Sequence, residues 1–181
     1  MPNSSSPVTR NFTTPKGSDS NGKGALKIIK APAGYGSRSM SEKEVEEFLD
    51  GGKLLIRLAT INPMGDPEIQ PAWYVYDRER LYLFTETNSR KVQNIRRRNS
   101  VYFTVDTEMS PYRGVKGKAT AMIVDDNARA LAMTEKIVRK YVGDPDGPDG
   151  KEMMDAVKKG TLVVVEIIPK FYSVWDYAQS R

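Results

Sequence analysis

The chain has 181 residues and a mass of 20.3 kDa, which suits one domain of ordinary size with its own core. It contains no cysteine and no histidine, which excludes disulfides, thiolate or imidazole catalysis, and metal or haem ligands of these types. The formal net charge of +5 lies entirely in residues 1–40, whereas residues 41–181 hold 22 basic and 22 acidic residues. The basic excess is therefore no reason to expect that the folded part binds nucleic acid.

The first 40 residues form a basic N-terminal tail ahead of a folded domain over residues 41–181. Seventeen of residues 1–24 are Ser, Thr, Asn, Gly or Pro, a composition that predicts a largely disordered arm. The short apolar run Ala25 to Ile29 is expected to pack on the domain as an extended segment. No stretch approaches the roughly 20 apolar residues that span a bilayer, and the start has no signal-peptide core. We therefore expect a cytoplasmic protein without a membrane partner.

The folded domain is predicted to open with a helix. Ser41 and Glu44 form a capping-box pattern, and Asp50-Gly51-Gly52 ends the helix. A strand over residues 54–61 follows, and then a second strand over residues 69–76. Pro71 lies inside this second strand, which predicts a sheet edge or a bulge because proline cannot donate to the ladder.

The remaining elements alternate between strands and helices joined mostly by short turns. In order, they are a strand at 81–85, a helix at 89–99, strands at 101–106 and 114–124, a helix at 126–142, a loop at 143–150, a helix at 151–158 and a strand at 161–168 ended by Pro169. Short links favour antiparallel pairing. Six antiparallel strands in about 140 residues close most easily as a small barrel.

The sharpest local pattern is Thr85-Glu86-Thr87-Asn88-Ser89-Arg90-Lys91, where a strand ends and a helix begins. Free backbone N–H groups and the helix dipole favour an anion at such a point. Ser89 offers a hydroxyl, Arg90 can bind phosphate through two hydrogen bonds, and Lys91 adds a point charge. The pattern indicates a phosphate site, and the alternative is a capped helix with solvated basic residues.

Three other patterns indicate a functional site less strongly. Trp73 and Tyr74 fit either a flat ligand or ordinary core packing. The aspartates in the loop at 143–150 lack the spacing of a calcium loop, so we expect no metal site. The run Arg96-Arg97-Arg98 suits a nucleic-acid contact, but the neutral charge of the domain argues against it, and we expect no nucleic-acid partner.

The order of these motifs resembles the pyridoxamine 5′-phosphate oxidase-like split-barrel flavoproteins. The resemblance covers about residues 41–177. The residues that carry it are Arg57-Leu58-Ala59-Thr60, Gly65-Asp66-Pro67, Pro71-Ala72-Trp73-Tyr74, Arg80 to Thr85, Ser89-Arg90-Lys91, Asn94-Ile95, Pro111 to Val115, Gly117-Lys118-Ala119, Ile168-Pro169 and Trp175-Asp176-Tyr177.

The resemblance implies a mainly β fold with peripheral helices, namely a six-stranded antiparallel split β-barrel of Greek-key type. It also implies a homodimer with flavin-type cofactors in clefts between the protomers. In the family, the cofactor phosphate lies at the Ser-Arg-Lys turn and the flavin ring lies along the second strand. Carried over to this chain, the cofactor-binding residues are Gln70, Pro71, Ala72, Trp73, Thr85, Ser89, Arg90 and Lys91.

Two branches of the family fit the cofactor site. The Ser-Arg-Lys triplet favours FMN, whereas Lys91, Asn94-Ile95 and Arg96-Arg97 also resemble the branch that uses the deazaflavin coenzyme F-420. Pyridoxamine phosphate oxidases carry an arginine on the second strand where this chain has Gln70, and they carry a histidine near the C-terminal substrate segment. This chain has neither, so pyridoxamine phosphate is not assigned as the substrate.

The resulting expectation is a flavin-dependent oxidoreductase that binds FMN at a dimer interface and transfers hydride to or from an unidentified small molecule. The alternatives are a deazaflavin-dependent reductase and a non-catalytic flavin- or ligand-binding module. Tyr74 and Tyr112 are the candidates for a catalytic proton donor. The substrate pocket is expected to involve residues 107–113 and 143–150.

Overall fold

The computed structural model describes residues 27–30 and 37–178, so the predicted arm over residues 1–24 lies outside the described residues. Twelve elements are present in this part of the chain. The strands are β1 (Lys27–Lys30), β2 (Ile56–Ile61), β3 (Pro67–Ala72), β4 (Val75–Asp77), β5 (Arg80–Glu86), β6 (Ser100–Asp106), β7 (Arg113–Ile123) and β8 (Leu162–Asp176). The helices are α1 (Glu42–Asp50), α2 (Arg90–Arg97), α3 (Asn127–Tyr141) and α4 (Pro148–Lys158).

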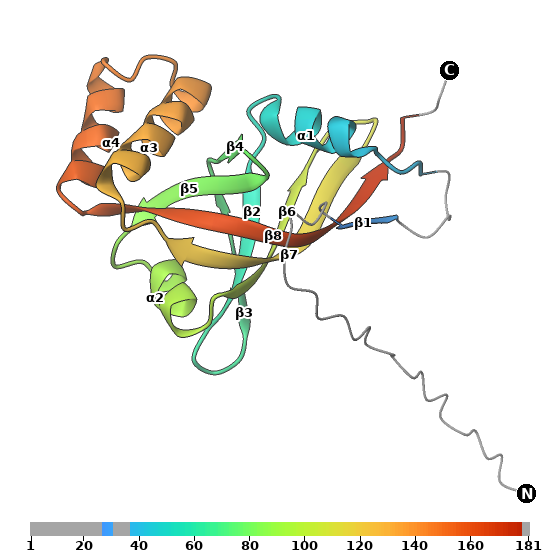
Figure 1. Cartoon of the computed structure of the whole chain (residues 1–181), viewed down its shortest axis with the longest axis horizontal. Helices are drawn as coiled ribbons and strands as arrows, with labels where there is room; N and C mark the ends of the chain where they lie inside the picture. The colour runs from blue at the N-terminus through green and yellow to red at the C-terminus, as the bar shows by residue number, and fades with distance from the viewer. Residues whose placement is uncertain (1–26, 31–36, 179–181) are drawn as a thin grey trace, which may run out of the picture.

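All the strands belong to one strongly curled sheet (Figure 1). Seven strands run in the order β3-β2-β6-β7-β8-β5-β4 with every neighbouring pair antiparallel, and β1 adds to β8 in parallel. This arrangement confirms the predicted class, a mainly β split barrel with peripheral helices. The strand count is higher than the expected six, because one predicted strand is divided and because β1 forms. The pairing of β1 also confirms that residues 27–30 pack on the domain as an extended segment.

The predicted strand at 69–76 is two strands, β3 and β4, separated by Trp73 and Tyr74. β3 pairs only with β2, so the expected edge position of Pro71 is confirmed. β4 pairs instead with β5, on the other side of the curled sheet. The chain therefore changes partner between Ala72 and Val75, and no continuous strand can serve both pairings.

The prediction that the last strand ends at Pro169 is wrong, because β8 continues through this proline to Asp176. Opposite Pro169, the register of β7 shifts between Lys118 and Ala119, which marks a β-bulge. Proline is tolerated at a bulge because the ladder hydrogen bond that it cannot donate is already interrupted there. The 15-residue β8 therefore pairs with β7, β5 and β1.

The helix ends follow from local capping chemistry. The predicted capping box is present at α1: the Glu44 amide donates to Ser41 Oγ at 3.3 Å, and the Ser41 amide donates to Glu44 Oε2 at 2.8 Å. The Asp126 carboxylate caps α3. α4 starts at Pro148, inside the region predicted as a loop, because proline is favourable in the first turn of a helix.

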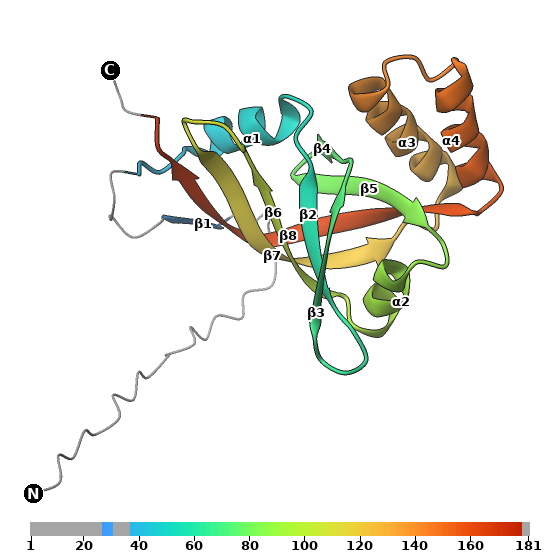
Figure 2. The ribbon, with the colours of Figure 1, turned by 180° about the vertical axis from the view of Figure 1, so that it is seen from behind.

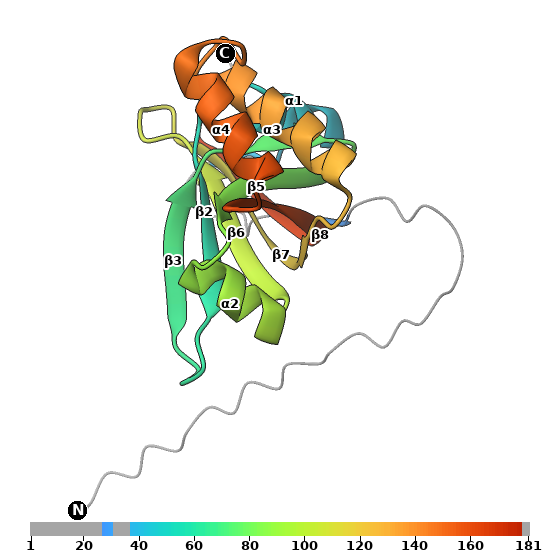
Figure 3. The same cartoon turned by 90° about the vertical axis from the view of Figure 1, so that its left-hand side faces the viewer.

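Two apolar clusters hold the domain together. The larger one fills the curl of the sheet and is closed by α1 through Val45, Phe48 and Leu49. The smaller one lies between the α3–α4 pair and the strands β4, β5 and β8. Seen from behind, α2 and the α3–α4 pair lie toward the same end of the sheet, away from β1 (Figure 2). From the side, the α3–α4 pair lies above and α2 below the strands β5 and β8 (Figure 3). No helix among residues 27–30 and 37–178 has the length and apolar character needed to cross a membrane.

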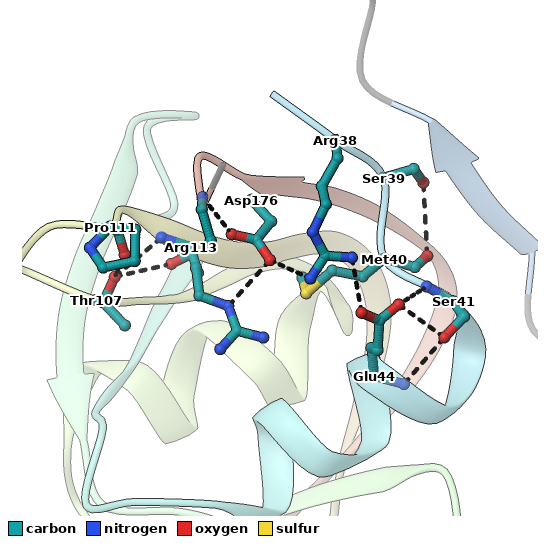
Figure 4. A network of polar contacts seen from close by, with 10 residues as sticks. Arg38, Ser39, Met40, Ser41, Glu44, Thr107, Pro111, Arg113 and Asp176 are labelled. Carbon is teal, nitrogen blue, oxygen red and sulfur yellow. Dashed lines mark hydrogen bonds and ion pairs between the residues drawn. The ribbon is translucent and has the colours of Figure 1, made fainter. Parts of the chain in front are cut away.

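A polar network fastens the start of the domain to the end of β8 (Figure 4). The buried Asp176 Oδ2 accepts a hydrogen bond from Arg38 Nη2 at 2.6 Å and forms an ion pair with Arg113, whose Nε lies 3.3 Å away. Arg38 also pairs with Glu44 at 2.7 Å and so reaches the capping box of α1. The backbone amide of Tyr177 donates to the Tyr112 carbonyl at 3.0 Å. The two motifs around Arg113 and Asp176 therefore form one structural unit.

Candidate cofactor site

The start of α2 has the local features that favour an anion. Ser89 caps the helix by accepting a hydrogen bond from the Val92 amide at 3.3 Å, and Thr85 Oγ1 donates to Ser89 Oγ at 3.4 Å. No acidic residue stands in the first turn, where Arg90 and Lys91 follow the cap. The structure thus brings together four of the residues predicted to bind the cofactor, at the positive end of the helix dipole.

Lys91 is the least ordinary residue of this site. Its side chain is only 5% exposed, and it has no hydrogen-bond or ion-pair partner among the described residues. Burial alone lowers the pKa of its ammonium group. Desolvation of a cation is costly, and a bound anion reduces that cost. The environment of Lys91 therefore fits a phosphate group.

Arg90 differs from Lys91 in being exposed, and it lies 3.3 Å from Glu68 of β3 in an ion pair. Glu68 also accepts a hydrogen bond from Asn94 Nδ2 at 3.1 Å, and the same amide group donates to Thr60 Oγ1 at 3.1 Å. These contacts tie α2 to β2 and β3. Sequence reasoning missed Glu68, although its spacing of two from Gln70 would have placed both on one face of a strand.

The residues predicted to line the flavin ring are divided between the two faces of β3. Side chains alternate along a strand, so Gln70 and Ala72 share the face of Glu68 and Pro71 points to the opposite face. Gln70 is opposite Leu58 of β2. One face of β3 therefore presents Gln70 close to the residues that anchor α2.

Trp73 follows β3 and forms the floor of a neighbouring pocket. Its ring stacks on Tyr141 of α3, with centroids 5.1 Å apart, and meets the edge of Phe84 at 6.3 Å. Phe84 directly precedes Thr85, so Trp73 lies near the strand that leads to α2. The pocket has a volume of about 760 Å³ and extends from Trp73 to the β5–α2 turn and α4.

The two tyrosines considered as proton donors lie away from the start of α2. Tyr74 is completely buried, its hydroxyl donates to the Leu49 carbonyl at 2.8 Å, and burial raises its pKa. These are the contacts of a core side chain. Tyr112 is exposed in the turn between β6 and β7. It lies at the opposite end of β6 from α2, roughly 20 Å of strand away.

Comparisons with known proteins bear on the family and the fold of the chain. A family model described as pyridoxamine 5′-phosphate oxidase matches residues 41–172. A conserved hypothetical protein from Mycobacterium tuberculosis is similar in structure, with 27% identity, a TM-score of 0.67, and coverage of 77% of this chain and 87% of that one. A protein described as an F-420 reductase shares 26% identity and a TM-score of 0.56 over 70% of this chain and 94% of its own.

A third structure, a FAD-binding protein from Mesorhizobium loti, is 19% identical with a TM-score of 0.57, and the match covers 77% of this chain and 97% of that one. At this identity it supports the fold alone. No curated protein sequence matches the chain significantly. The family match spans the curled sheet, α2 and most of β8, including the residues at the helix start. On this evidence, the chain belongs to the pyridoxamine 5′-phosphate oxidase family.

Proposed function

We propose that this protein is an oxidoreductase that binds a flavin-type cofactor with the cofactor phosphate at the start of α2. The observation that carries the proposal is the largely desolvated Lys91 side chain, which forms no ion pair among the described residues, beside the free N–H groups of a helix that has no acid in its first turn. Membership of a flavin-binding family gives this anion site its expected ligand.

The residues of the chain have separate tasks in this proposal. Lys91 and Arg90 hold the phosphate, and Ser89 fixes the helix start against Thr85. Gln70 and Trp73 position the ring, and neighbouring side chains keep water from it. The cofactor, when bound, supplies the hydride chemistry. Because Arg90 pairs with Glu68 through one exposed contact, it is free to turn toward a phosphate.

FMN is the first choice of cofactor because of the Ser-Arg-Lys triplet. The deazaflavin coenzyme F-420 is the second choice, favoured by the similarity to a protein described as an F-420 reductase. Arg96 and Arg97 at the end of α2 are exposed and make no ion pair among the described residues, which leaves them available to a more anionic cofactor. A module that binds the cofactor without turnover is the third possibility.

The protein is further proposed to act as a homodimer through the outer face of the sheet. Ile69 and Tyr102 are 65% and 54% exposed on this face and, together with Phe171, line an apolar groove of about 410 Å³. A second copy would cover these side chains. Tyr112 lies far from α2 in its own chain, so it can reach a cofactor site only from such a second copy.

The test is a titration of stripped protein with FMN and with the deazaflavin, followed by absorption and fluorescence. The variants Lys91→Met and Arg90→Ala should each weaken binding of the preferred cofactor by roughly ten- to a hundredfold, the value of a charge-assisted phosphate contact. Arg98→Ala removes an exposed arginine from the other end of α2 and should leave the affinity unchanged. Wild-type protein that binds neither cofactor would refute the proposal, as would equal affinities in all the variants.

A further inference from the structure

We infer that a small cavity between α1 and the β4–β5 hairpin is a binding site for a guanidinium group, carried either by a free small molecule or by an exposed arginine of another protein. The cavity shares no lining residue with the pocket beside Trp73 and none with the start of α2. The inference therefore goes beyond the proposed function and does not depend on it.

The cavity forms where segments that are far apart in the sequence meet. β1, α1, β4, the β4–β5 turn and β8 each contribute to its wall, through Ile28, Glu42, Val45, Glu46, Tyr76, Glu79 and Tyr172. Its volume of about 130 Å³ is well below the roughly 300 Å³ at which pockets for whole drug-sized ligands begin. The cavity therefore has room for one functional group of a ligand rather than for a cofactor.

Tyr172 supplies an unsatisfied polar group inside this cavity. The residue lies on β8 and is only 2% exposed, and its hydroxyl has no hydrogen-bond partner among the described residues. Buried tyrosine hydroxyls usually have a partner, because a buried polar group without one costs free energy. Tyr74 shows the ordinary case, with its hydrogen bond to the Leu49 carbonyl. A ligand that brings N–H groups into the cavity would give the Tyr172 hydroxyl the partner that it lacks.

Three carboxylates make the cavity negative. Glu42 and Glu46 stand four residues apart on α1, which places them on one side of the helix, and Glu79 comes from the β4–β5 turn. None of the three forms an ion pair within residues 27–30 and 37–178, and no residue that lines the cavity is basic. They are not grouped closely enough to form a metal site in that part of the chain. The cavity therefore favours an organic cation over a neutral or anionic group.

The field of these carboxylates reaches the buried phenols. Burial raises the pKa of Tyr172, and it raises the pKa of the neighbouring Tyr76 to about 12. The negative charges of Glu46 and Glu79 add to the increase in both pKa values, because they oppose ionisation of a phenol. Both hydroxyls therefore stay neutral, and a cation that accepts this field can donate hydrogen bonds to them.

A guanidinium group suits both the phenols and the carboxylates. When it carries one substituent it is planar, presents five N–H donors and keeps its charge at any physiological pH. It is also hydrated more weakly than an ammonium group, so its transfer into a small cavity costs less. One guanidinium can donate to the buried Tyr172 hydroxyl and, through its other N–H groups, to the exposed carboxylates of Glu46 and Glu79.

The experiment compares methylguanidinium with methylurea, which have nearly the same planar shape and differ in charge. The full chain, with carbon-13 in its tyrosine rings, is titrated with millimolar probe at low and at physiological ionic strength. Methylguanidinium should shift the ring signals of Tyr172 and Tyr76 and leave that of Tyr102, on the outer sheet face, unchanged. It should bind about tenfold more tightly than methylurea, and the ratio should fall as salt screens the carboxylates.

Two variants test the phenol and the carboxylates separately. Tyr172→Phe removes only the hydroxyl and should weaken the binding of methylguanidinium by about three- to tenfold. The free variant should unfold at no lower temperature than wild type, because no hydrogen bond is lost. Glu42→Gln combined with Glu46→Gln and Glu79→Gln should bring the ratio of the two affinities to about one.

Glu47→Gln is the matched control, because Glu47 is an acid of the same helix that pairs with Lys43 outside the cavity. N-acetylarginine methylamide separates the two sources of the group: it should bind more tightly than methylguanidinium if the ligand is an arginine of another protein, and more weakly if the ligand is a free guanidino compound. Equal binding of methylguanidinium and methylurea by wild-type protein would overturn the inference, as would an affinity that Tyr172→Phe leaves unchanged.

Discussion

At the level of single residues, Lys91 is expected to favour cofactor binding while it lowers the stability of the unliganded protein. Its side chain is largely desolvated and forms no ion pair among the described residues, so its charge costs stability in the unliganded protein, and a bound phosphate would supply the counter-ion. The pKa of Lys91 is lowered by burial, and the unfolded chain therefore binds more protons in the alkaline range. The stability penalty appears as the pH falls below the usual lysine pKa of 10.5, and it has its full size once the pH is below the lowered pKa of the folded state.

The variant Lys91→Met retains the length of the side chain and removes the charge. We expect the unliganded variant to be more stable than wild type by about 0.5–2 kcal/mol at neutral pH, because the buried charge is absent. Urea unfolding of stripped protein measures this difference. Saturation with the preferred cofactor should reverse the order of stability, since only wild type gains from binding. A stripped variant less stable than wild type would show that Lys91 has a partner in solution.

Glu44 gives the fold an acid-sensitive contact. The Ser41 backbone amide, the Arg38 guanidinium and the Ser41 hydroxyl lower the pKa of Glu44 from 4.5 to about 2. Because the folded-state pKa is the lower one, the contact stabilises the protein above pH 4.5, and the contribution is lost as the pH falls toward 2. Glu44→Gln should flatten the loss of stability across this range, measured by thermal unfolding. Glu42→Gln removes one acid from the same helix and should keep the wild-type slope.

At the level of elements, the starts of helices were easier to predict from the sequence than the ends of strands. The start of α1 and the start of α2 were predictable because each depends on a side chain three residues or fewer from the groups it caps. The passage of β8 through Pro169 was not, because it depends on a bulge in the pairing of β8 with β7, a strand about 50 residues earlier. The break between β3 and β4 likewise depends on strand pairing, because β3 pairs with β2 whereas β4 pairs with β5.

The candidate cofactor site divides in the same way. The Ser89-Arg90-Lys91 turn was recognisable as an anion site from local spacing. Two features were not recognisable: the burial of Lys91 and the ion pair between Glu68 and Arg90, which arise where α2 packs on β2 and β3. The pocket between α4 and the β5–α2 turn was not recognisable either, because it forms where these distant segments meet. Contacts between distant segments cannot be inferred from the local pattern of either segment.

The buried carboxylate of Asp176 holds the end of β8 in place, and a substitution of this residue tests that role. The variant Asp176→Asn keeps the shape of the side chain and removes the charge that Arg38 and Arg113 share. We expect a loss of about 1–3 kcal/mol in the free energy of unfolding, since a buried carboxylate with two cationic partners is replaced by a neutral amide. Hydrogen exchange should quicken at the Arg38 amide, which donates to the Asp176 carbonyl. Glu108→Gln, at an exposed ion pair with Arg57, should change stability by less than about 1 kcal/mol.

At the level of the whole molecule, the exposed apolar side chains of the outer sheet face are the proposed dimer contact. Ile69→Glu places a charge on that face and should convert the proposed dimer to a monomer in sedimentation velocity, because burying an unpaired carboxylate is costly. The monomer should also bind the cofactor weakly if the second copy completes the site. Met64→Glu alters a side chain that is 84% exposed in the β2–β3 turn, and it should leave the dimer intact. A monomeric wild-type protein that still binds the cofactor would contradict the dimer proposal.

The central position of β8 has a consequence for how the protein is made. Before β8 is available, β2, β3, β6 and β7 can form one sheet and β4 with β5 a separate hairpin, because only β8 joins β7 to β5. α2 connects these two halves, so the positive helix start and the pocket wall cannot take their final places in a nascent chain that has not yet reached residue 162. We therefore expect cofactor capture to follow the synthesis of β8, after a slow docking of two half-sheets.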